Sequence, residues 1–140
     1  MKTPQSTLNV ERVAGTGGAL CGALAVLLGA FGAHALREHL GSDALAIWRT
    51  AVDYLFWHAL VLVLVAARAR QAPARSLCVA TPAFLLGIVL FCGSLIALAL
   101  GASRMIGYVT PLGGAAFVVG WIALCISFIG KSARNVNDVR

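Results

Sequence analysis

Charged residues are scarce in this chain, where they make up only 11% of 140 residues. A soluble domain typically contains about 25% charged residues. Hydrophobic residues make up 60%, and the mean hydropathy is +0.90. Because too few polar side chains remain to cover a surface that faces water, the composition excludes an ordinary soluble domain and indicates a lipid environment.

The sequence also lacks the common catalytic motifs. It contains no glycine-rich phosphate loop, no nucleophile elbow and no His-Glu-x-x-His zinc motif. Four cysteines lie inside apolar stretches and form no Cys-x-x-Cys pair, which indicates small buried side chains rather than disulfides or a metal cluster. These are Cys21, Cys78, Cys92 and Cys125. We therefore expect a non-enzymatic protein without cofactor or metal, and an intramembrane enzyme remains the open alternative.

Four long apolar segments fill most of the chain. They cover residues 13–36, 51–67, 77–100 and 109–130. A helix needs about 20 apolar residues to cross a hydrocarbon core of about 30 Å, so only the second segment, with 17 residues, is short for a span. The runs are continuous, whereas the strands of a membrane barrel alternate between apolar and polar residues. The sequence therefore predicts an all-α fold, an integral membrane four-helix bundle.

The predicted organisation is a single transmembrane domain over residues 13–130 between polar tails at 1–12 and 131–140. Ala33-His34-Ala35 fits the small-x-small pattern of a signal-peptidase site. The apolar stretch before it is about 20 residues long, whereas the apolar region of a signal peptide has about 7–15. The first segment is therefore predicted to remain in the protein as a helix.

The distribution of Lys and Arg predicts an orientation. Eight lie in the two tails and the second connector: Lys2, Arg12, Arg68, Arg70, Arg75, Lys131, Arg134 and Arg140. Three lie on the other side: Arg37, Arg49 and Arg104. Basic residues favour the cytoplasmic side, so both termini are predicted to be cytoplasmic. The net charge of +6 sits at helix ends, which favours anionic lipid headgroups over nucleic acid as the partner.

Small residues recur at spacings that place them on one face of a helix. Such faces let the backbones of membrane helices approach closely. We expect the contact seams of the bundle at these positions, of which the pair at 18 and 22 forms a Gly-x-x-x-Gly motif. The predicted packing residues are Gly18, Gly22, Gly29, Gly93, Ala97, Gly101 and Gly120.

Three ionisable residues, His34, Asp53 and His58, lie within the apolar segments or at their ends. Ionisable groups in a membrane are costly, so each is a functional candidate. His34 and Asp53 are predicted at similar depth in an antiparallel hairpin, with His58 about 7 Å deeper. Arg49 and Asp53 are four residues apart and could pair, and Tyr54 shares a helix face with His58. These groups could form a proton relay or a ligand site, or could serve the structure alone.

The ends of the segments carry further signals. Trp48 and Trp57 suit an interfacial aromatic belt. The connector that holds Arg68 is predicted to be an exposed turn. Thr-Pro pairs suit helix starts, and they predict helices that begin near Thr81 and Thr110, unless the first begins near Ser76. Gly101 suits the position after a last helical turn.

Five short motifs in order resemble a known family. They are GAFGAHAL from residue 29, TAVDYLFWHAL from residue 50, FCGSL from residue 91, TPLGG from residue 110 and Gly120-Trp121. The chain resembles the small bacterial inner-membrane proteins grouped as domain of unknown function 423, over about residues 13–130. The resemblance implies a four-helix integral membrane protein and carries no activity with it.

These features together predict a multi-pass protein of the bacterial inner membrane that acts as an accessory or interaction bundle. The expected partners are membrane lipids, together with a second copy or another membrane protein, and no nucleic acid. One alternative is a small oligomeric transporter or proton-linked carrier that uses His34, Asp53 and His58. Another is a haem- or quinone-associated accessory protein, in which His34 and His58 would be the haem ligands.

Overall fold

The computed structural model describes the backbone of residues 5–137 and the side chains of residues 9–129. Within these residues every regular element is helical. In chain order they are α1 (Gln5–His34), α2 (Ser42–Gln71), α3 (Leu77–Gly87), the π-helix η1 (Ile88–Cys92), α4 (Gly93–Ala99), the 3-10 helix η2 (Arg104–Tyr108) and α5 (Thr110–Asn137). The predicted all-α fold is confirmed.

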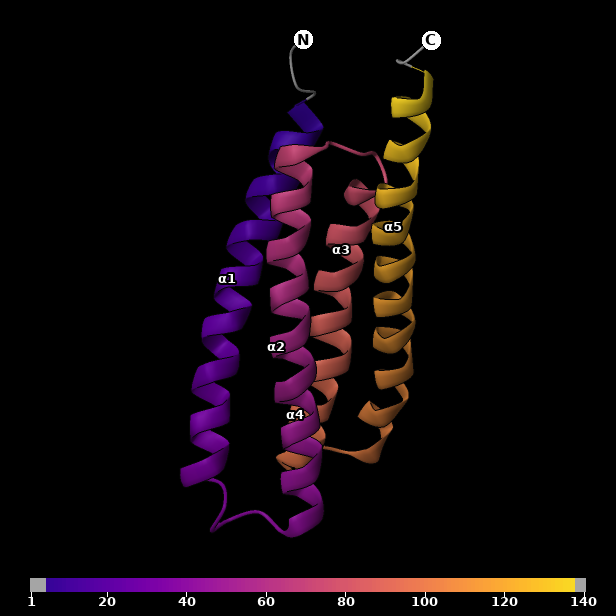
Figure 1. Cartoon of the computed structure of the whole chain (residues 1–140). Coiled ribbons are helices and arrows are strands. Elements are labelled where there is room, and N and C mark those ends of the chain that lie inside the picture. Colours follow the sequence, from indigo (N-terminus) through magenta and orange to yellow (C-terminus); the bar gives the residue numbers. More distant parts are fainter. Residues whose placement is uncertain (1–4, 138–140) are drawn as a thin grey trace.

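The helices form four rods that lie side by side and alternate in direction (Figure 1). One rod is composite, because α3, η1 and α4 follow one another without a break. Four stretches of the described chain are long and apolar enough to cross a membrane: Asn9–His34, Ser42–Gln71, Leu77–Ala99 and Arg104–Ile129. The start of α1 and the end of α5 lie at the same end of the bundle (Figure 1). The chain is an integral membrane four-helix bundle, as the sequence predicts.

The helix ends show which local signals the backbone follows. α5 begins at Thr110, as predicted, and α3 begins at Leu77, so the alternative start near Ser76 is confirmed. Pro82 consequently lies inside α3. α1 begins at Gln5 and α5 continues to Asn137, so helix extends into both stretches predicted as tails.

Gly101 ends the third rod in a Schellman motif. Its φ of 90° lies in the left-handed region, where a side chain clashes with the backbone. The amide of Ala102 donates to the carbonyl of Ala97 at 2.9 Å, and the amide of Gly101 donates to the carbonyl of Leu98 at 3.0 Å. These two bonds satisfy carbonyls that the helix end would leave unpaired. The predicted stop at Gly101 is confirmed.

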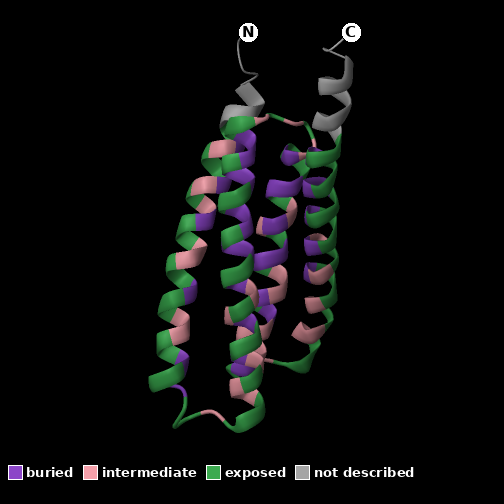
Figure 2. Ribbon diagram, in the orientation of Figure 1, coloured by how far each residue is buried: buried purple, intermediate pink, exposed green. Residues whose placement is uncertain are grey.

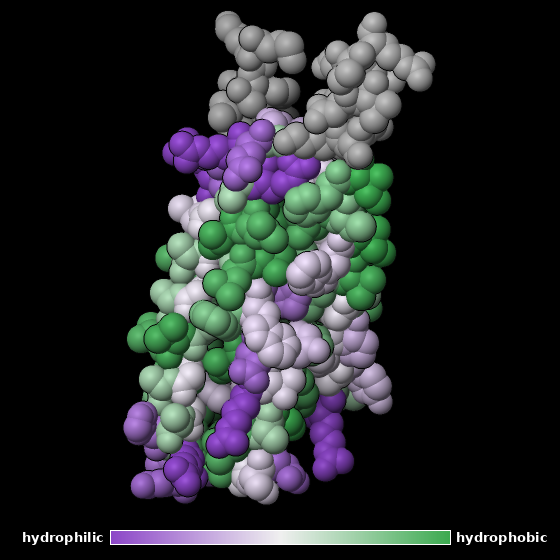
Figure 3. Space-filling model, in the orientation of Figure 1, coloured by the Kyte–Doolittle hydropathy of each residue, from purple (hydrophilic) through white to green (hydrophobic). Residues whose placement is uncertain are grey.

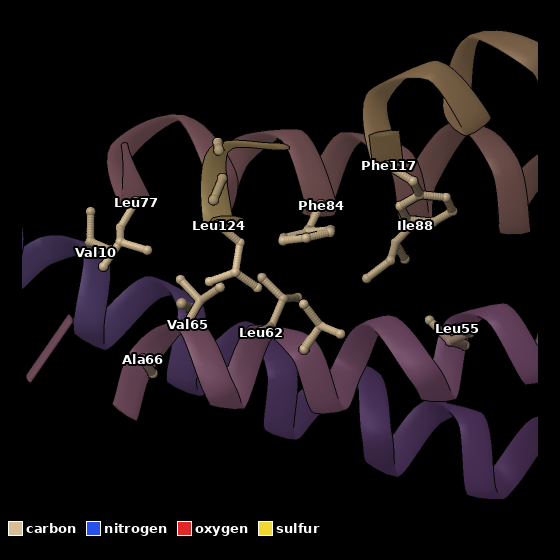
Figure 4. Packing of buried hydrophobic residues seen from close by; sticks show 14 of the residues in the cluster. Val10, Leu55, Leu62, Val65, Ala66, Leu77, Phe84, Ile88, Phe117 and Leu124 are labelled. Carbon is tan, nitrogen blue, oxygen red and sulfur yellow. The ribbon is translucent and has the colours of Figure 1, made fainter. Parts of the chain in front are cut away.

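Large apolar side chains from three rods meet at the centre of the bundle. Leu62 and Val65 of α2 point toward Phe84 of α3 and Leu124 of α5 (Figure 4). Phe84, Leu62 and Val65 are completely buried. Buried positions line the inner sides of the rods, and exposed positions cover their outer sides (Figure 2).

The outer surface carries the apolar residues that a soluble protein would bury. Leu20 and Leu27 of α1, Val89 of η1 and Ile129 of α5 are each at least 67% exposed. On the face that Figure 3 shows, hydrophobic residues form a broad zone, and hydrophilic ones gather toward the two ends of the bundle. This surface suits contact with lipid chains, because an apolar side chain loses no free energy by facing lipid.

Two residues near the helix ends are placed differently from the sequence prediction. The belt prediction is wrong for Trp48, which is only 3% exposed and whose Nε1 donates to the carbonyl of Leu28 at 3.1 Å. Trp48 occupies the space opposite Gly32, where a Cβ would lie 2.4 Å from the indole Nε1. Trp57 is 53% exposed, consistent with the predicted position.

The prediction of an exposed turn is wrong for Arg68, which lies within α2 and is only 9% exposed. Its Nη1 donates to the carbonyl of Ala72 at 3.1 Å, and its Nη2 donates to the carbonyl of Ser127 at 2.5 Å. The guanidinium carbon lies 4.8 Å from the ring centroid of Phe128. Because the arginine stem is long, its charged group reaches from α2 to α5 and ties the two helices together.

Candidate functional site

Of the three predicted ionisable candidates, His58 is the one that the fold places inside the bundle. It lies on α2 and is only 4% exposed. Aromatic rings of α2, α3 and α5 lie against it, and Phe91 of η1 packs on two of them, Tyr54 and Phe117. We call this group the aromatic cluster. It consists of His58, Tyr54, Phe84, Phe91, Phe117 and Trp121. A buried ionisable residue in a membrane span is a candidate functional group by default, so this cluster is the candidate site.

The two nitrogens of the His58 ring have different surroundings. Nδ1 lies 2.8 Å from the backbone carbonyl of Tyr54. Because a carbonyl oxygen only accepts hydrogen bonds, Nδ1 carries a proton, and a neutral imidazole then keeps a lone pair on Nε2. The ring stacks on Phe117 with centroids 3.6 Å apart and planes 10° apart. The site therefore presents one imidazole nitrogen, held in a fixed orientation by aromatic packing.

The π-helix η1 forms one wall of the cluster. Phe91 of η1 stacks on Tyr54 with centroids 4.6 Å apart. The backbone of Phe91 touches α5 at Gly113, where a Cβ would lie 2.3 Å from the Phe91 nitrogen. Just beyond η1, the hydroxyls of Ser94 and Thr110 lie 2.7 Å apart. A π-turn often marks a functional position in a helix, and here it brings Phe91 into the cluster.

The other predicted site residues lie outside this cluster. His34, Arg49 and Asp53 are all exposed. Within the part of the chain whose side chains are described, Arg49 and Asp53 form no ion pair. Gly32 faces Trp48 across the α1–α2 contact. His34 is two residues beyond Gly32 and Asp53 is five residues beyond Trp48 in the opposite direction, so their depths differ by about 10 Å rather than being similar.

Shared ligation by His34 and His58 does not fit this arrangement. A Cβ on Gly22 of α1 would lie 3.9 Å from Ala59, so His58 is level with Gly22. His34 is twelve residues farther along α1, which separates the two imidazoles by about 18 Å along the helix axis. Among the described residues no group of three His, Cys, Asp or Glu side chains could hold a metal ion.

The predicted glycines of α1 lie against α2. A Cβ on Gly18 would lie 2.8 Å from the carbonyl oxygen of Ala59, and one on Gly29 would lie 3.6 Å from the Val52 side chain. Together with Gly22, these residues let the backbones of α1 and α2 approach closely.

The predicted row of small residues after the π-helix lies differently. A Cβ on Gly93 or Gly101 would meet nothing within 4 Å, and both residues are exposed, whereas Ala97 is half-buried. The structure thus differs from the prediction of a contact seam at Gly93 and Gly101. On α5, a Cβ on Gly120 would lie 2.8 Å from the Phe84 ring.

Sequence reasoning missed the rings around His58 and the glycines that admit them. Gly87 makes room for Phe117, and Gly113 makes room for the Phe91 backbone. One signal was available, because Phe84, Phe91 and Phe117 lie in the middle of apolar segments rather than at their ends, where interfacial aromatics gather.

Comparison with known proteins identifies the family. The family model described as "Protein of unknown function (DUF423)" matches residues 28–114. The chain belongs to the DUF423 family. The matched region runs from the end of α1 to the start of α5, and it includes His58, η1 and Gly113.

Curated DUF423 relatives cover nearly the same length. "UPF0382 membrane protein YwdK" of Bacillus subtilis is 41% identical over 80% of this chain and 92% of its own length. "UPF0382 membrane protein SH2409" of Staphylococcus haemolyticus is 40% identical over 81% and 94%. "UPF0382 inner membrane protein YgdD" of Escherichia coli is 33% identical over 85% and 91%. No solved structure matches the chain. The relatives agree with the fold in being named as membrane proteins.

Proposed function

We propose that this DUF423 protein is a non-enzymatic accessory protein of the bacterial inner membrane that acts through lateral contacts with lipids and with another membrane protein or a second copy. The carrying observation is the placement of Arg49 and Asp53, which are exposed on α2 and unpaired with each other within the described chain. Charged groups near a membrane span are costly unless water or a partner satisfies them. A neighbouring protein that offers polar groups at this depth would satisfy Arg49 and Asp53.

The exposed surface around these two residues suits a contact between helices. Trp57 lies one turn beyond Asp53 on the same helix face and is 53% exposed. Tryptophan supplies a large apolar contact area together with one hydrogen-bond donor, which is why it is common at the centre of interfaces. We call the exposed residues Arg49, Asp53 and Trp57 the α2 contact face.

Gentle release from the native membrane followed by native mass spectrometry tests this proposal. We expect a defined oligomer or a stable complex with another membrane protein, and we expect Asp53→Asn to reduce its fraction. Glu38→Gln is the matched control, because Glu38 is also an exposed carboxylate and lies in the connector outside the spans. A bare monomer that carries only lipids would overturn the proposal.

The proposed orientation places both termini and the connector between α2 and α3 in the cytoplasm. The support is the excess of Lys and Arg in the two tails and in that connector. An alkaline phosphatase fused after Arg140 should be inactive, and one inserted at Gly41, in the exposed connector before α2, should be active. The reverse pattern of activities would refute this orientation.

A proton-linked carrier is the second candidate, and the burial of His58 favours it. A neutral His58 offers a lone pair on Nε2 inside the bundle, which is a group that can accept a proton. Since four helices enclose little space, the carrier would have to be an oligomer. Proton flux into vesicles should then fall with His58→Gln and with Asp53→Asn. Flux that equals that of protein-free vesicles would exclude the carrier.

A further inference from the structure

A groove runs between α3 and α5 on the outside of the bundle. Its volume is about 250 Å³, and Ser76, Val79, Val119, Ile122, Ala123 and Ile126 line it. Val119, Ile122 and Ile126 are each about half exposed. They form one stripe over eight residues of α5, so the groove extends for about 10 Å along the helix axis, in the direction of a lipid chain.

Ser76 is the one polar residue of the groove, and its hydroxyl is unsatisfied. The Ser76 Oγ is buried and has no hydrogen-bond partner among the described residues. Because this oxygen is buried, the surface that the groove presents is apolar, which suits a lipid chain. Ser76 lies just before α3 begins, at the end of the bundle where α1 begins and α5 ends (Figure 1).

Positive charge gathers at this end of the groove. Arg75 precedes Ser76 and is exposed, as is Arg70 at the end of α2. The buried Arg68 donates only to backbone carbonyls, and its Nε has no partner within the described chain. None of the three arginines forms an ion pair with a carboxylate among the described side chains. The apolar groove therefore ends beside arginines whose positive charge is not balanced by a carboxylate among the described side chains.

We propose that the groove holds one acyl chain of an anionic phospholipid whose phosphate lies against Arg75. The apolar lining contacts the chain, and the Arg75 guanidinium donates charge-assisted hydrogen bonds to phosphate oxygens. This site rests on the proposed function, because it specifies the lipid contact that the proposed function includes. In the proposed orientation the lipid belongs to the cytoplasmic leaflet.

Native mass spectrometry of the detergent-solubilised protein, titrated with phosphatidylglycerol and with phosphatidylcholine of identical chains, tests this site. We expect phosphatidylglycerol to bind the wild type at least about fivefold more tightly, since one arginine near the headgroups contributes about that factor. Arg75→Gln should abolish the preference. Arg104→Gln, which removes an exposed arginine at the opposite end, should retain it.

A second pair of variants tests the groove itself. Val119→Trp fills it and should weaken the binding of both lipids about tenfold, whereas Val118→Trp places the same bulk on the neighbouring exposed residue outside the lining and should change nothing. Ile126→Trp repeats the test if Val119→Trp does not fold. Equal binding of the two lipids by the wild type, or equal effects of the two Val→Trp variants, would overturn the site. Neither outcome bears on the α2 contact face, whose association is measured separately with Asp53→Asn.

Discussion

The tightest backbone contact in the candidate site predicts the effect of a single methyl group. A Cβ on Gly113 would lie 2.3 Å from the Phe91 nitrogen and 2.8 Å from the Phe91 Cα. Both are backbone atoms, so no side-chain rotation relieves the clash, and α5 must move away from η1. Overpacking of this kind costs about 1–3 kcal/mol. Alanine also favours a helix over glycine by about 1 kcal/mol, which partly offsets that cost.

Gly93→Ala isolates the clash from the helix preference. Gly93 is also helical, and a Cβ there would meet nothing within 4 Å. Gly113→Ala should therefore be about 1–3 kcal/mol less stable than Gly93→Ala in reversible unfolding by SDS in mixed micelles, followed by tryptophan fluorescence and circular dichroism. If the two variants unfold within about 0.5 kcal/mol of each other, the close approach of α5 to η1 is not a real constraint on this fold.

Substitutions at three further residues probe other contacts, each by the same unfolding measurement. His58→Phe keeps a ring against Phe117 and should lower the free energy of unfolding by less than about 1.5 kcal/mol, whereas His58→Ala leaves a cavity and should lower it by about 3 kcal/mol. Equal losses of stability would mean that the Nδ1 hydrogen bond, not packing, holds the residue. Gly101→Ala should cost about 1–2 kcal/mol because of its positive φ, and an unchanged stability would contradict the Schellman end. Trp48→Phe loses the hydrogen bond to Leu28 and should cost about 1 kcal/mol, while a neutral effect would show that burial alone places the indole.

The sequence predicts the parts of this fold that depend on local signals or on solvent. The number of spans follows from the length of the apolar segments, because lipid leaves helices as the structure for such runs. The start at Thr110 and the stop at Gly101 follow from the backbone preferences of Pro111 and of glycine. None of these predictions requires knowledge of which helix faces which.

The positions that the sequence places incorrectly depend on contacts between helices. The sequence predicts that Arg68 is an exposed connector residue, but its side chain is long enough to reach a carbonyl on α5. Trp48 reads as interfacial, but Gly32 on the preceding helix opens a space for the indole. Gly93 belongs to a regular row of small residues, yet Gly93 and Gly101 of that row are exposed. A regular spacing of small residues shows that one face of a helix lacks large side chains. It does not show whether another helix or lipid lies against that face.

The π-turn of η1 has a consequence for the evolution of the family. A π-turn holds one more residue than the α-turn it replaces, so it accommodates a single-residue insertion within a helix without displacing the residues on either side. A homologue that is one residue shorter between Ile88 and Cys92 would close this turn as ordinary α-helix and still present Phe84 and Ser94 to the same neighbours. Length variation at this point of a span is therefore compatible with a conserved bundle, whereas a gap elsewhere in the same helix would rotate every following side chain by about 100°.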